Sequence, residues 1–200
     1  AQIRMLPWPF FPIINTFGDH PIVKNMDAIS MKFVANIDTV KAEGIKKTPL
    51  LYTSQYSRIL AAPVRIAMND LQKSLNPELY NKGQQAVSYL LEGKFSSLYK
   101  NRIPPEGVDK SDFKDIGKES AIIVCSDGDV IRNEFNLKTG VPLDLGVDPY
   151  NPQVVYANKD FILNSLEYLL NDNGIITAKA KEIKLRPLDK IKVANEKTKW

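Results

Sequence analysis

The sequence predicts an α/β domain in which a mixed sheet is flanked by helices. Two segments lead to this prediction. Residues 119–125 form a continuous apolar run rich in β-branched side chains, and residues 158–172 repeat apolar side chains at helical spacing. A strand that is apolar throughout is typical of a parallel sheet, whereas several earlier segments alternate apolar and polar residues. The expected sheet is therefore mixed.

The first half of the chain holds most of the expected strands. Residues 6–15 contain three prolines and three aromatic residues, which predict an extended segment packed by its rings. Alternating or short apolar segments predict strands over residues 30–39, 48–54, 63–68 and 85–92. Residues 69–85 are polar and contain Asn-Pro, so a loop is expected there.

The second half holds the buried strand and the helix. Residues 119–125 predict a strand buried on both faces, followed by a turn and a short helix, and prolines and glycines in residues 136–153 predict a loop. In the helix over 158–172, Asn158 is the expected N-cap. Its expected core face is formed by Ile162, Leu166, Leu169 and Leu170.

The domain organisation follows from these elements. A final strand is expected over residues 175–185, so residues 1–185 are predicted to form a single α/β domain. Within it, residues 76–118 are expected to be largely an irregular connection, and residues 186–200 a basic C-terminal tail.

Composition excludes several classes of protein. The chain has 200 residues, of which 44% are hydrophobic and 25% charged, as in ordinary soluble globular proteins. A chain of this size can bury about 70% of its unfolded surface, so disulfides are not needed. One histidine, His20, and one cysteine, Cys125, cannot form an internal disulfide or a Cys/His zinc site. We expect no metal and no cofactor.

Positive charge is concentrated at the C-terminus. The formal net charge is +4, yet residues 179–200 alone carry +5, with eight Lys/Arg against three Asp/Glu. Because basic residues are not interleaved with aromatic residues over a face, a nucleic-acid partner is not expected. The tail predicts either a solvated strand end or a stalk close to anionic lipid headgroups. The sequence lacks an apolar run of 18 residues and a signal peptide, and its start without Met favours an excised domain or a mature fragment.

The clearest candidate site follows the buried strand. Ser126, Asp127 and Asp129 lie in an S-D-G-D turn, at the kind of strand end where α/β sheets bind ligands. Two carboxylates there could hold Mg²⁺, and the motif resembles the first motif of haloacid-dehalogenase-type phosphatases, with Asp127 as nucleophile and Asp129 as general acid. That motif normally opens its domain, and no convincing acidic pair follows downstream. The residue types favour a structural interpretation, in which Ser126 and Asp127 cap and turn the chain.

Other catalytic arrangements find little support. A nucleophilic cysteine needs a base, and nothing in the sequence brings His20 to Cys125, so a buried inert thiol is expected. His20, which precedes Pro21, is expected to bond neighbouring backbone groups. Neither the Walker phosphate loop nor a GxGxxG motif occurs, so the chain is not an ATPase of the P-loop type.

An ordered set of segments carries a family resemblance. The segments are LPWPFFPIIN, HPIVKNMDAISMKFVANIDTV, KKTPLLYTSQYS, YLLEGKFSSLYKNR, IIVCSDGDVIRNEF, NKDFILNSLEYLLND and GIITAKAKEIKLRPLD. Together they resemble the gliding-motility-associated ABC-transporter auxiliary protein, the G subunit, of Bacteroidetes. The resemblance covers nearly the whole chain.

The resemblance implies a membrane-anchored, extracytoplasmic accessory component that works with separate permease and ATPase subunits. It implies a fold similar to class I glutamine amidotransferase-like, flavodoxin-like domains without their nucleophile, and hence no enzymatic activity. Asn158 and Asn164 would then fix the turn and the helix start. The resemblance also implies that earlier strands of the parent precede this sequence, and that a membrane helix follows Trp200 and makes the basic tail a juxtamembrane stalk.

We therefore expect a non-enzymatic, extracytoplasmic interaction domain of an ABC transporter complex of the gliding-motility type. Two alternatives stay open: a Mg²⁺-dependent phosphatase centred on Asp127 and Asp129, and a small-molecule or glycan-binding module that uses the cleft at the same strand ends. The candidate ligand-binding or structural residues are Ser126, Asp127, Asp129 and Asn158.

Overall fold

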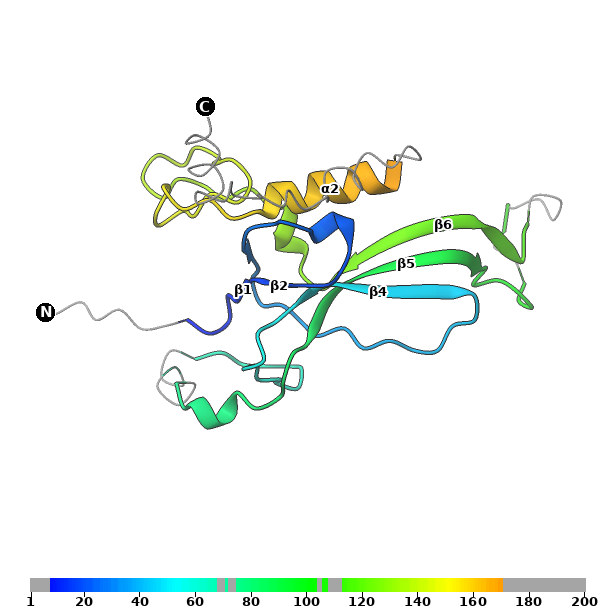
Figure 1. The fold of residues 1–200 in the computed structure, drawn as a ribbon, viewed down its shortest axis with the longest axis horizontal. Helices are drawn as coiled ribbons and strands as arrows, with labels where there is room; N and C mark the ends of the chain where they lie inside the picture. Colours follow the sequence, from blue (N-terminus) through cyan, green and yellow to red (C-terminus); the bar gives the residue numbers. More distant parts are fainter. Residues whose placement is uncertain (1–7, 68–70, 72–74, 104–105, 108–112, 171–200) are drawn as a thin grey trace, which may run out of the picture.

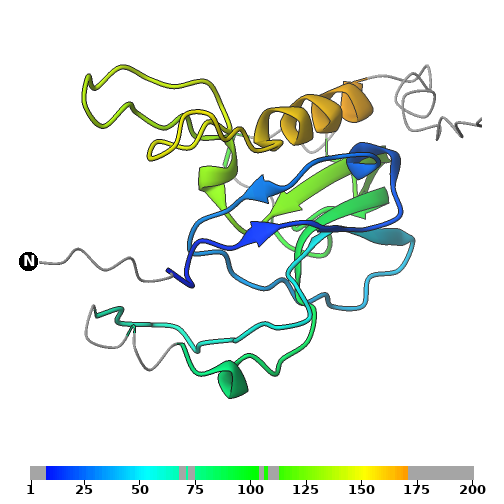
Figure 2. The ribbon, with the colours of Figure 1, turned by 60° about the vertical axis from the view of Figure 1, so that its left-hand side comes forward.

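The centre of the molecule is a four-stranded antiparallel sheet. The computed structural model describes residues 8–67, 71, 75–103, 106–107 and 113–170. The spatial order of the strands is β2 (Thr16–Phe17), β4 (Ile45–Tyr52), β5 (Ala86–Ser96) and β6 (Ile116–Cys125). A smaller antiparallel pair joins β1 (Ile13–Ile14) to β3 (Ile29–Ser30). Helix α2 (Asn158–Leu170) lies on one side of the strands, and residues 53–67 and 75–85 lie on the opposite side (Figure 1, Figure 2).

Three short 3₁₀ turns begin at capping side chains. They are η1 (Pro21–Val23), η3 (Pro77–Leu79) and η4 (Gly128–Ile131). His20, Asn76 and Asp127 precede them, and each side chain accepts a hydrogen bond from a backbone N–H of the first turn. These caps satisfy donors that a short helix leaves without an intrahelical partner.

The core gathers side chains from both sheets and α2. Its fully buried members come from η1, β3, β4, β5 and the helix, and Phe161 is the largest of them. The buried cluster comprises Ile14, Ile22, Val23, Ile29, Met31, Leu50, Leu51, Val87, Leu90, Val130, Ala157 and Phe161. The core therefore depends on segments that are far apart in sequence.

Gly93 interrupts β5 where another backbone comes close. Its φ is +142°, and a Cβ there would overlap the carbonyl oxygen of Gly44. A side chain at this position would be strained and would collide with backbone, so glycine is required.

The α/β class is confirmed, but the expected sheet geometry is wrong. All strand pairs in the described part of the chain are antiparallel, so the sheet is neither parallel nor mixed. This topology gives no support to the amidotransferase-like, flavodoxin-like resemblance. The expectation that residues 119–125 are buried on both faces is also wrong: Ile122 and Val124 are 45% and 39% exposed, while Ile123 and Cys125 pack against the core. The continuous apolar run therefore lies in an edge strand that packs against the core with only one of its faces.

Two predicted strands are not formed. Residues 30–39 continue β3 only at Ser30, and the backbone turns at Phe33, whose φ is +50°. The N–H groups of Met31 and Phe33 bond to Pro12 and Phe10 outside any ladder. Residues 63–67 are irregular, and residue 68 lies outside the described residues. The alternation of apolar and polar residues in these two segments therefore does not correspond to strand pairing.

The remaining predictions are confirmed with changed boundaries. The strands predicted over 48–54 and 85–92 are β4 and β5. β5 continues to Ser96 and β6 begins at Ile116, so the expected irregular connection contains parts of two strands. Of the expected loop over 69–85, residues 71 and 75–85 are described; Leu71 is helical, and the rest is irregular apart from η3. The expected loop over 136–153 holds no named helix or strand, only isolated bridges at Pro142 and Val147.

Helix α2 is present, but its buried face differs from the prediction. Asn158, Phe161 and Ser165 are buried, whereas Leu166 is 48% exposed and Leu170 is 83% exposed. Polar side chains on the inward face bond to neighbouring segments, and this turns the leucines outward. Of the predicted core face, Ile162 packs against the core, whereas the three leucines do not.

Several expectations fall outside the described residues. These are the end of the predicted helix, the final strand over 175–185 and the basic tail over 186–200. Among the helices that the structure describes, none combines the length and the apolar character needed to cross a lipid bilayer.

Candidate functional site

The predicted turn residue Asp127 is buried and bonded at both carboxylate oxygens. Its side chain caps η4, with Oδ1 accepting the N–H of Asp129 at 2.8 Å. Oδ2 accepts the N–H of Lys32 at 2.6 Å, although Lys32 is 95 residues away in sequence. Each carboxylate oxygen thus already has a backbone donor, and the side chain ties η4 to the segment after β3.

Asn158 ties the same region to the helix. Its Oδ1 accepts the N–H of Ser30 at 3.0 Å. Its Nδ2 donates to the carbonyl oxygens of Ser30 at 2.8 Å and of Val130 at 3.1 Å. One turn along the helix, Asn164 donates to the carbonyl oxygen of Ile22 at 3.1 Å. Asp127 and Asn158 therefore hold two points of one backbone stretch, residues 30–32; we call Asp127, Asn158 and this stretch the polar joint.

The other two predicted residues face different partners. Ser126 bonds the carbonyl oxygen of Val87 through both its N–H and its hydroxyl. Asp129 forms an ion pair with Arg132 at 3.0 Å. The carboxylates of Asp127 and Asp129 are each engaged by the chain itself, and the described residues contain no group of three metal-ligating side chains. This arrangement is suited to fixing the fold, because both oxygens of Asp127 are held by backbone donors.

A second polar cluster lies where η1 meets α2 and the sheet. The N–H of Ile22 donates to Nδ1 of His20 at 3.3 Å, as the sequence predicted for this histidine, and the His20 ring meets Tyr168 edge-on, with centroids 4.9 Å apart. The Tyr168 hydroxyl donates to Glu92, which also lies 3.6 Å from Lys46. Burial lowers the pKa of His20 and, with the Glu92 carboxylate, raises the pKa of Tyr168 to about 12.

Cys125 lies at the end of β6, half-buried beside the core. Burial raises the pKa of its thiol, so the reactive thiolate is disfavoured. The close contacts of His20 are with Ile22 and Tyr168. In the described residues, His20 is therefore not placed to act as a base for the Cys125 thiol.

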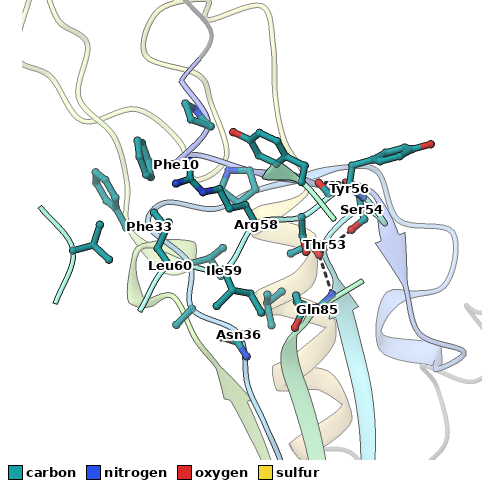
Figure 3. A pocket seen from close by; sticks show the side chains of 18 of the residues that line it. Phe10, Phe33, Asn36, Thr53, Ser54, Tyr56, Arg58, Ile59, Leu60 and Gln85 are labelled. Atoms are coloured by element: carbon teal, nitrogen blue, oxygen red, sulfur yellow. Dashed lines mark hydrogen bonds between the residues drawn. The ribbon is translucent and has the colours of Figure 1, made fainter. Parts of the chain in front are cut away.

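A cavity of about 880 Å³ lies on the opposite side of the strands from α2. Its walls come from three stretches of chain and three single residues, namely 9–10, 12–14, 33–36, 53–54, 56–62, Val64 and Ile66, with Tyr80, Gln85 and Val87. Figure 3 shows Phe10, Phe33, Ile59 and Leu60 around this space, with Arg58 extending between them toward Phe10. We call it the apolar cavity, because hydrocarbon side chains dominate its lining.

Backbone hydrogen bonds, together with the hydroxyls of Thr53 and Ser57, hold the walls of the apolar cavity. At its root, the N–H of Thr53 bonds the carbonyl oxygen of Gln85, and the N–H of Gln85 bonds Oγ1 of Thr53 (Figure 3). Ser57 bonds both Lys82 and Gly83, which keeps the two limbs of segment 53–85 together. The opposite wall is held by the bond from the N–H of Phe33 to Phe10.

Charge in the apolar cavity is one-sided. Among the described residues that line it, none is acidic and Arg58 is the single cation. Arg58 has no ion-pair or hydrogen-bond partner in the described part of the chain.

Sequence reasoning missed this cavity. It placed a ligand cleft at the strand ends near Asp127, and interpreted the apolar residues Phe33, Val64 and Ile66 as strand positions. The available signal in residues 53–66 was the combination of a proline, alternating apolar and polar residues, and an arginine. These residues form no strand after the end of β4.

Comparison with known proteins gives one match. A family model described as an ABC-type uncharacterized transport system matches residues 1–165. No curated protein and no solved structure matches the chain.

Proposed function

Because the chain belongs to the family described as an ABC-type uncharacterized transport system, we propose that it is a non-enzymatic, extracytoplasmic accessory domain of a transporter complex of the gliding-motility type. The family identifies it as an auxiliary component of an ABC-type transport system, and such a component associates with transporter subunits. The match over residues 1–165 carries this proposal.

The chemistry of the predicted turn supports a role without catalysis. Both oxygens of Asp127 accept backbone N–H groups, and Asp129 pairs with Arg132. A phosphatase nucleophile needs an oxygen free to attack phosphorus, and the general acid must be free to protonate the leaving group. The same contacts weigh against the Mg²⁺-dependent phosphatase.

The proposed partners are the permease and the ATPase of the complex. The sequence lacks a nucleotide-binding loop, so ATP hydrolysis must come from another subunit. We test the partnership by tagging the membrane-anchored parent protein and purifying it from its own cells. Co-purification of both subunits supports the proposal, and recovery of neither subunit contradicts it.

The proposed extracytoplasmic location is tested by chemical labelling. Val40 is 82% exposed, so Val40→Cys in a Cys125→Ser background offers a single accessible thiol within these 200 residues of the parent protein. A membrane-impermeant maleimide should label this thiol after the outer membrane is permeabilised and the inner membrane left intact. Labelling only after the inner membrane is broken would place the domain in the cytoplasm. Cys125→Ser alone is the matched control.

A further inference from the structure

We propose that the apolar cavity binds a small amphiphile with an apolar body and a single anionic group, such as a long-chain carboxylate. The proposal rests on the lining and charge of the cavity, and does not depend on the transporter assignment. It places ligand binding on the opposite side of the strands from the predicted turn.

The lining matches an apolar body. Phe10, Phe33, Ile59, Leu60 and Val64 line the cavity, and the last four are more than a third exposed rather than packed in the core. Accessible apolar surface of this kind gains free energy when a hydrocarbon covers it. The volume of about 880 Å³ lies within the usual range of small-molecule sites.

Several polar side chains of the lining are already engaged, whereas the Asn36 side chain has no hydrogen-bond partner among the described residues. Thr53 accepts from the N–H of Gln85 and donates to the carbonyl oxygen of Ser54. Ser54 donates to the carbonyl oxygen of Tyr56, and the amide of Gln85 donates to Lys82. A glycan needs many free hydrogen-bond partners for its hydroxyls, and this lining provides few of them. The arrangement therefore favours a ligand whose body makes no hydrogen bonds.

Arg58 provides the preference for an anion. A guanidinium cannot lose its charge at ordinary pH, and it binds carboxylate and sulfonate oxygens through paired N–H donors. Since no lining residue is acidic and Arg58 has no partner in the described residues, an incoming anion meets one free cation and no repelling charge. A ligand with several negative charges, such as a nucleotide, would leave most of its charge unmatched.

Two fluorescent probes that differ by one charge test the proposal. Anilinonaphthalene sulfonate is anionic, and N-phenylnaphthylamine is its neutral counterpart. We expect both to bind the 200-residue chain saturably, with the sulfonate weakened by added salt and the amine unaffected. Decanoate should displace the sulfonate at lower concentration than decanol does. Absence of saturable binding of either probe would overturn the proposal.

Three variants locate the binding. Arg58→Gln should weaken sulfonate binding about five-fold, the scale of a partly exposed ion pair, and leave amine binding unchanged. Arg65→Gln is the matched control, since Arg65 is exposed in the same segment but does not line the cavity, and it should change neither probe. Ile59→Ser shortens an apolar wall and should weaken both probes.

The outcomes separate this proposal from the transporter assignment. Equal effects of Arg58→Gln and Arg65→Gln would reduce the interaction to general surface charge and overturn the anion preference. Unchanged binding in Ile59→Ser would place the probes elsewhere and overturn the site. Recovery of transporter subunits by the parent protein decides the proposed function alone, whatever the probes show.

Discussion

The polar joint and the apolar cavity distribute their side chains in opposite ways. In the joint, the polar groups of Asp127 and Asn158 are buried, 6% and 4% exposed, and fully bonded. In the cavity, apolar side chains such as Ile59 and Leu60 are accessible, and the guanidinium of Arg58 has no partner among the described residues. Groups whose bonding capacity is filled stabilise a fold, whereas groups with unfilled capacity are available to a ligand.

The two regions are also held differently. Side chains join distant backbone segments at the polar joint, so single substitutions there remove several bonds. Backbone hydrogen bonds hold the cavity walls, so most single substitutions of its side chains leave the walls in place. We therefore expect stability to change at the joint and binding to change at the cavity.

The largest expected effect is that of Asn158→Ala. It removes three hydrogen bonds and leaves the buried polar groups of Ser30 and Val130 without their partner. At about 1 kcal/mol for each bond, the free energy of unfolding should fall by about 3 kcal/mol. Urea unfolding followed by tyrosine and tryptophan fluorescence measures this. Asn164→Ala, which removes one bond, should cost about 1 kcal/mol. Equal losses in the two variants would contradict the larger stabilising role that we assign to Asn158 in the polar joint.

Asp127→Asn should have the next largest effect. The asparagine amide can place an oxygen toward only one of the two N–H donors, from Lys32 and Asp129, and its nitrogen then faces the other. We expect a loss of about 2 kcal/mol in the free energy of unfolding. Asp129→Asn removes the same charge from a partly exposed pair and should cost less than about 0.5 kcal/mol. Equal effects would show that charge, and not the cap, is responsible.

His20 should make stability fall in weakly acidic solution. Burial lowers its pKa in the folded chain below the unfolded value near 6.5, against the opposing effect of Glu92. The unfolded chain therefore binds the proton first, so the contribution is fully present above pH 6.5 and is lost as the pH falls below it. His20→Asn keeps an acceptor for the N–H of Ile22, and its thermal midpoint should vary less between pH 7.5 and pH 5, values chosen to bracket about 6.5. If the thermal midpoints of the two proteins change equally with pH, His20 is not the origin of the pH dependence.

The smallest expected effect on stability belongs to the cavity. Arg58→Gln and Ile59→Ser change exposed side chains that hold no wall, so each should alter the free energy of unfolding by less than about 0.5 kcal/mol. Urea unfolding of both variants beside Asn158→Ala checks the comparison in one experiment. A loss above 1 kcal/mol, about twice that bound, would mean that the cavity lining is part of the core.

Local sequence patterns predicted the strong elements well. The helical spacing of residues 158–170 and the apolar segments at β4, β5 and β6 correspond to the observed elements. The predicted site residues Asp127 and Asn158 lie together, as turn and capping residues do when they follow a strand and begin a helix. The helix, the strands and the turn at Asp127 depend on neighbours in sequence, whereas the bonds of Asp127 and Asn158 to residues 30–32 join segments that are far apart in the chain.

Features that depend on distant partners could not be predicted in the same way. The apolar run of β6 does not reveal whether another layer covers the outer face of the strand. The exposure of Ile122 shows that none of the described residues covers it. Likewise, Val64 and Phe33 alternate with polar residues as a strand would, but they line a cavity formed by segments that are far apart in the chain, from Pro9 to Val87. In α2, Asn158 and Asn164 oriented the helix, because their bonding partners outweighed the leucine stripe.

The position of β6 at the end of the sheet has a consequence for handling the protein. On the side away from β5, no strand in the described part of the chain pairs with it, and such an edge can recruit a strand from another molecule. Lys118 and Glu119 interrupt its exposed half with charge, which is how natural edge strands resist this stacking. The solubility of the purified domain therefore rests in part on two surface charges that contribute little to its folding.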